Sequence, residues 1–176
     1  MTDRSAINEL TILFDHILEE HGFGWDHWHS LLWNLHNVRP EDWDALPVGG
    51  GRTIRELVIH IGRGWAVYGD NGLTGKPRQW GDDDLDGILP GTSPAEVERW
   101  LRAAHARYRE ALTKLSDHQL DDRAEAVWGE KFEIRRLIEL QIQTSFYHIG
   151  EINHIRALLQ GNDDWDHQDM GREDEQ

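Results

Sequence analysis

Residues 132–160 read FEIRRLIELQIQTSFYHIGEINHIRALLQ, with apolar side chains recurring at intervals of three and four residues. This spacing places them on one face of an α-helix. Gly161 follows directly, and glycine is common just past a helix end. We therefore expect a long helix from about Phe132 to Gln160 with one side in a core. Its inward stripe comprises Ile134, Ile138, Ile152, Ile155 and Leu159, and His148 falls on the same stripe.

Capping residues predict a second helix earlier in the chain. Ser93 is a typical N-cap, Pro94 suits the first helical position, and Glu96 completes a capping box. Ser116 and Asp117 are expected to end this helix.

A third helix is expected to open at Thr53, because Glu56 stands three positions later and completes another capping box. His60 lies next to its apolar face rather than opposite it. That face comprises Ile54, Leu57, Val58, Ile61 and Trp65.

The amino-terminal region has two stretches with helical periodicity. The first runs from about Ile7 to His21 and is interrupted by Gly22-Phe23-Gly24. The second ends before Arg39-Pro40, and the pattern leaves open whether the two form one kinked helix or two. Its apolar face comprises Trp25, Trp28, Leu32 and Leu35.

With its connections included, the sequence predicts an all-α fold, a four-helix bundle with long connecting loops. Glycines, prolines and the run Asp82-Asp83-Asp84 predict a long loop from Gly69 to Thr92, either a functional cover or a variable connection. The acidic run is expected to be solvated. No alternation typical of strands is apparent, so we expect no sheet. One domain should span residues 1–161, and the acidic residues 162–176 should form a disordered tail.

Composition excludes several classes of function. The chain has 176 residues and no cysteine, so disulfides, thiolate metal sites and a cysteine nucleophile are excluded. A net charge of -15 argues against nucleic-acid binding, because phosphates would be repelled. We find no apolar run long enough for a membrane span and no signal core, and therefore expect a cytoplasmic protein with no membrane partner.

Two histidines stand where imidazole is unusual. A buried ring nitrogen without a partner costs about 1–3 kcal/mol, so apolar helix faces normally exclude histidine. His60 and His148 nevertheless lie on or beside such faces. If their helices are neighbours, both rings can point into one cavity. The simpler alternative is a pair of hydrogen-bonded core histidines.

Three segments resemble the DinB-like family. The run YHIGEINHIR, from Tyr147 to Arg156, resembles its closing motif on the last long helix. The run RTIRELVIHI, from Arg52 to Ile61, resembles its metal-bearing second helix, and Pro40 to Trp43 precede it as Pro-Glu-Asp-Trp. The resemblance covers most of residues 25 to 160.

This resemblance implies a four-helix bundle, often dimeric, in which three histidines hold a divalent metal, commonly zinc or nickel. His60 matches the ligand from the second helix, and His148 matches the second member of a His-x3-His pair on the last helix. The first member falls on Thr144. Two imidazoles and water would hold a transition metal more weakly than three imidazoles.

Another side chain could complete the metal site. Glu151 lies one turn from His148 and could be a third ligand or a partner that orients the ring. His154 should point elsewhere. The amino-terminal histidines offer another route, although we expect them to be surface or packing residues: His16, His21, His27, His29 and His36. Trp65 and Tyr68 are the aromatic residues expected nearest the pocket.

Three functions are compatible with these features. The first is a metal-dependent transferase, isomerase or hydrolase that acts on a small molecule. Such an enzyme could also use a low-molecular-weight thiol. The second is a non-catalytic small-ligand-binding or stress-response module with a degenerate metal site, which the residue at position 144 favours. The third function, metal storage, has less support, because the spacing of the amino-terminal histidines does not bring their side chains together. A homodimer is the expected assembly.

Overall fold

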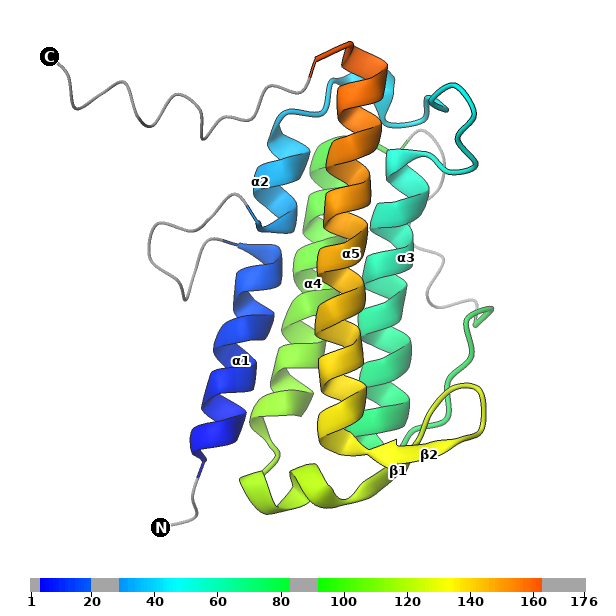
Figure 1. Cartoon of the computed structure of the whole chain (residues 1–176). Coiled ribbons are helices and arrows are strands. Elements are labelled where there is room, and N and C mark those ends of the chain that lie inside the picture. Colours follow the sequence, from blue (N-terminus) through cyan, green and yellow to red (C-terminus); the bar gives the residue numbers. More distant parts are fainter. Residues whose placement is uncertain (1–3, 20–28, 83–91, 163–176) are drawn as a thin grey trace, which may run out of the picture.

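Five α-helices form the body of the molecule in the computed structural model, which describes residues 4–19, 29–82 and 92–162 (Figure 1). α1 and α2 follow one another along one side, so that together with α3, α4 and α5 they make four columns. The expected all-α bundle is therefore confirmed. The helices are α1 (Ser5–Leu18), α2 (Leu31–His36), α3 (Ile54–Tyr68), α4 (Pro94–Thr113) and α5 (Ile134–Gln160).

The helix starts predicted from capping residues are confirmed. The Thr53 hydroxyl accepts from the Glu56 backbone N–H at 3.2 Å, and the Glu56 carboxylate accepts from the Thr53 N–H at 2.8 Å. Ser93 and Glu96 make the same reciprocal pair at the start of α4. These contacts satisfy amides that a helix start would otherwise leave unpaired.

Aromatic side chains of α1, α3 and α4 pack together in the core, to which α5 also contributes a row of buried isoleucines. The Phe14 ring stacks on Tyr108 with centroids 4.4 Å apart and meets Trp65 edge-on at 5.6 Å. All three side chains are almost wholly buried. α3 also packs along α5, so the surfaces that carry His60 and His148 are neighbours.

The amino-terminal stretches form two helices rather than one kinked helix. α1 ends at Leu18, where Glu19 turns to an extended conformation, and α2 begins at Leu31 with Ser30 as its cap. The interrupting glycines, Trp25 and Trp28 lie outside the described residues. Most of the predicted tail does as well, although the Asn162 side chain accepts a hydrogen bond from Arg156 at 3.2 Å.

A short hairpin corrects the expectation of no sheet. β1 (Arg123–Glu125) pairs antiparallel with β2 (Lys131–Glu133), and the turn contains Gly129 at a φ of 89°. Strands of three residues are too short to show alternation in a sequence. Because Phe132 belongs to β2, α5 begins at Ile134, slightly later than predicted.

The predicted loop from Gly69 is also partly wrong. Residues Gly69–Thr74 continue α3 as a π-helical turn, which Gly75 ends at a φ of 67°. Short 3-10 turns occur at Pro40–Asp42 and Asp117–Asp121. Glycine lowers helix propensity, but packing against the neighbouring helices overrides it here.

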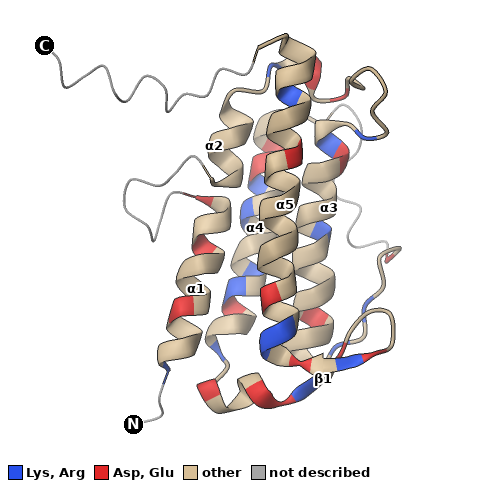
Figure 2. Cartoon of the chain, in the orientation of Figure 1, with Lys and Arg blue, Asp and Glu red and all other residues tan. Residues whose placement is uncertain are grey.

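Charged residues are spread over the helices, but the middle of α5 carries none (Figure 2). Residues 140–150 contain no Asp, Glu, Lys or Arg. Within the described ranges, no helix has the length and apolar character needed to cross a membrane.

Candidate functional site

His60 of α3 and His148 of α5 meet between their helices. The ring centroids are 4.8 Å apart, and the rings are nearly perpendicular at 89°. His148 is buried and His60 is half-buried. The structure thus brings together the two imidazoles that the sequence singled out.

Glu151 contacts His148 on the side of Nδ1. Its Oε2 lies 2.9 Å from that nitrogen, one helical turn along α5. In a neutral ring an Nδ1–H donates to the carboxylate, which leaves the lone pair on Nε2 available for a ligand. This arrangement is typical of a carboxylate that orients a histidine. Of the two roles considered for Glu151, the geometry therefore favours orientation over ligation.

The Trp80 ring covers one face of His60. The Trp80 ring stacks parallel on His60 with centroids 5.1 Å apart and an interplanar angle of 5°. Burial lowers the pKa of His60 below its ordinary value, and the charges of His148 and Arg52 lower it further, while Glu151 opposes them. His60 is therefore held in the neutral form that can donate a lone pair.

A cavity of about 60 Å³ lies beside His60. Its walls include Tyr68, Trp80 and Thr144, the residue that stands where the resemblance predicts a histidine. The volume is of the order of two water molecules, since each occupies about 30 Å³ in the liquid. Thr144 and His60 thus line one small space.

Gln141 forms another wall of this cavity, and its side-chain oxygen is a buried acceptor. Ser145 donates its only proton to the Gln141 backbone carbonyl at 2.8 Å and accepts from Trp65 Nε1 at 3.1 Å. Gln141 must therefore turn its NH₂ toward Ser145, 3.4 Å away. In the described part of the chain, Gln141 Oε1 then has no hydrogen-bond partner.

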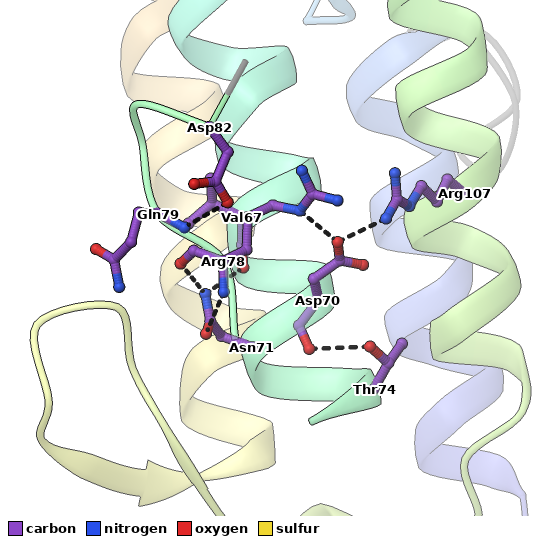
Figure 3. Close-up of polar contacts among 8 residues, drawn as sticks. All are labelled: Val67, Asp70, Asn71, Thr74, Arg78, Gln79, Asp82 and Arg107. Carbon is purple, nitrogen blue, oxygen red and sulfur yellow. Dashed lines mark hydrogen bonds and ion pairs between the residues drawn. The ribbon is translucent and has the colours of Figure 1, made fainter. Parts of the chain in front are cut away.

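The segment that carries Trp80 is tied to the end of α3 (Figure 3). The Asn71 side chain donates to the Val67 carbonyl at 2.9 Å and the Arg78 carbonyl at 2.8 Å, and accepts from the Arg78 N–H at 3.2 Å. These bonds fix the backbone two residues before Trp80. The ring can therefore be held over His60 by a segment with little regular structure.

An ion-pair cluster adds to this attachment (Figure 3). Asp70 is buried, and its Oδ2 accepts from Arg78 Nε at 2.5 Å and from Arg107 at 2.6 Å. Arg107 belongs to α4, so the cluster joins the segment to two helices. Two guanidiniums beside one buried carboxylate offset the cost of removing its charge from water.

A larger groove, of about 500 Å³, opens on the outer side of His148. The loop Pro47–Gly51 forms one wall together with Arg52, and α5 forms the other wall with His148 and Glu151. His154 is exposed and lines this groove, away from the cavity beside His60.

The other sequence candidates lie elsewhere. His16 is buried in α1 near Phe146, with ring centroids 6.1 Å apart, whereas His29 and His36 are exposed. His21 and His27 lie outside the described residues. Trp65, expected near the pocket, is wholly buried and does not line the cavity, whereas Tyr68 does.

Sequence reasoning missed Trp80, Gln141 and Asn71. Each lacked a detectable signal, because a single Trp in a loop or an amide on a helix becomes meaningful only when its neighbours are known. In the described ranges, no three side chains among His, Cys, Asp and Glu are grouped closely enough to hold a metal ion together.

The chain matches the family model described as the DinB superfamily over residues 26–152. The matched region includes α2, α3, α4 and most of α5, and therefore both His60 and His148. None of the curated proteins compared with the chain matches it.

Proposed function

This chain belongs to the DinB superfamily, and we propose that His60 and His148 hold a divalent metal ion, zinc or nickel, for chemistry on a small molecule. One observation carries the proposal. The two imidazoles meet at 4.8 Å, and Glu151 occupies the Nδ1 side of His148 at 2.9 Å. Metal-binding histidines typically have such a carboxylate on the nitrogen that does not face the metal.

The donor set fits an ion held by two protein ligands. Each imidazole can present one lone pair, whereas Glu151 is engaged by His148. Thr144 offers only a neutral hydroxyl, so the remaining coordination positions are left to water or substrate. Affinity should be lower than in a site with three histidines.

The chain's own residues prepare the ligands. Glu151 fixes the tautomer and orientation of His148, and Trp80 packs on His60 in a partly dry setting. When bound, the metal would lower the pKa of a coordinated water or thiol. Since the chain has no cysteine, sulfur chemistry would use a low-molecular-weight thiol carried by the substrate. Transfer, isomerisation and hydrolysis are the reaction classes that this arrangement suits.

A second function is a non-catalytic binding module with a degenerate metal site. The observation that favours it is Thr144, together with the lack of a three-donor group among the described residues. In that case the histidine pair would serve as a hydrogen-bonding wall for a small ligand. A homodimer and a cytoplasmic location stay predictions from the sequence.

Metal content of protein purified without an affinity tag separates the two functions. We expect the wild type to retain zinc or nickel in proportion to protein, His60→Ala to lose it, and Thr144→His to bind at least about tenfold more tightly, because it would supply a third imidazole. His36→Ala, at an exposed histidine, is the matched control and should behave as the wild type. Metal found only in Thr144→His would support the degenerate module.

A further inference from the structure

The groove outside His148 gathers exposed apolar side chains. Val48 is fully exposed, and Tyr147 and Leu158 are 71% and 55% exposed. All three line this groove, from opposite walls. Exposed apolar groups that converge on one concave surface are typical of a ligand site rather than of scattered surface residues.

Arg52 supplies a cation at the same place. It is exposed at the rim, and within the described residues it makes no hydrogen bond or ion pair. Glu151, the acidic residue in the lining, is already engaged by His148 at 2.9 Å. The Arg52 guanidinium is therefore available to pair with an anionic ligand in the groove.

We propose that this groove binds a small amphipathic acid, whose anionic oxygens pair with Arg52 and whose apolar part lies on Val48, Tyr147 and Leu158. Guanidinium matches carboxylate, sulfonate and phosphate oxygens in geometry and charge. A cationic molecule would be repelled by Arg52, and a neutral one would leave it unused. The proposal rests on the proposed function in one respect, that the ligand's other end reaches His148.

A pair of fluorescent probes tests the charge requirement. Anilinonaphthalene sulfonate carries the acidic group, and N-phenylnaphthylamine has the same rings without it. In titrations of the full chain at low salt, Arg52→Gln should weaken binding of the sulfonate by about twofold to fivefold, the range expected for an exposed ion pair, and leave binding of the neutral probe unchanged. Arg52→Lys should restore part of the affinity. Leu158→Gln should weaken both probes.

Arg99→Gln is the matched control, since it removes an exposed arginine of α4 that does not line the groove. Equal loss of sulfonate binding in Arg52→Gln and Arg99→Gln would overturn the proposal. So would sulfonate binding that declines as the protein dimerises in sedimentation runs, because the groove would then be covered by a second copy.

Repeating the titrations with chelator and with added zinc separates the two proposals. Arg52 is not a metal donor, so its selective effect should persist in metal-free protein. If zinc fails to bind but the Arg52 effect remains, the proposed function fails and the acid site stands. If zinc binds and Arg52 has no selective effect, the acid site fails alone.

Discussion

At the scale of single residues, the site depends on how two imidazoles are oriented and on the lowered pKa of one of them. Glu151 orients His148, and burial with neighbouring charge lowers the pKa of His60. The sequence singled out His60 and His148 because imidazole is unusual on apolar helix faces, and Glu151 because it lies one turn from His148. It could not identify Trp80 or Gln141, whose roles depend on contacts between distant segments.

Replacing Glu151 distinguishes an orienting carboxylate from a ligand. Glu151→Ala should weaken zinc binding by about 10-fold to 100-fold, the usual cost of losing such a partner. Glu151→Gln keeps an acceptor for the Nδ1–H, so its zinc affinity should lie between those of Glu151→Ala and the wild type. Isothermal titration with zinc measures both, with Glu139→Ala as the control on the same helix. Loss as complete as in His148→Ala would instead identify Glu151 as a ligand.

His105 predicts a pH dependence of stability. It is buried in the core, its Nε2 donates to the Phe14 carbonyl at 3.1 Å, and burial lowers its pKa below the ordinary 6.5. The unfolded chain therefore takes up the proton more readily than the folded chain. The contribution of neutral His105 to the free energy of unfolding is complete above about pH 6.5 and is lost as the pH falls below that value.

Urea unfolding at about pH 7.5 and about pH 5.5 checks this expectation. The wild type should lose more free energy of unfolding on acidification than His105→Gln, whose amide can still donate to Phe14 but does not titrate. His60 contributes in the same direction, so some dependence should remain. An identical loss in both proteins would rule out His105 as a source.

At the scale of elements, α3 positions both His60 and the segment that carries Trp80. Its cap fixes where it begins, its close packing on α4 and α5 sets the position of His60, and its π-helical end supports the Trp80 segment. Capping residues and periodicity predicted the helices well because they are local signals. The hairpin and the π-helical turn were missed because tertiary contacts determine them.

Two helical glycines should respond oppositely to alanine. A Cβ on Gly62 of α3 would lie 2.2 Å from the Trp100 ring, whereas one on Gly150 of α5 meets nothing within 4 Å. Gly150→Ala should therefore raise the free energy of unfolding by about 0.4–1 kcal/mol. Gly62→Ala should lower it by about 1–3 kcal/mol, because the ring must move. Urea denaturation measures both, and stabilisation by Gly62→Ala would contradict the close packing of α3 on α4.

At the scale of the whole molecule, the bundle places two different spaces on either side of one histidine pair. The small cavity beside Thr144 and Gln141 lies within the bundle, and the large groove beside Arg52 opens outward. The fold class followed from the sequence, since four amphipathic segments have few ways to cover one another. A cavity between the two histidine-bearing helices was also expected from the sequence, but the groove was not, because one of its walls is the loop Pro47–Gly51, whose course no local pattern specifies.

Zinc titration of the wild type, His60→Ala, His148→Ala and the double variant tests the metal pair most directly. If one ion bridges both rings, each single variant should lose zinc binding to a similar extent, and the double variant should lose little more, since the ligands act as a unit. Undiminished binding in either single variant would contradict a shared ion at this pair.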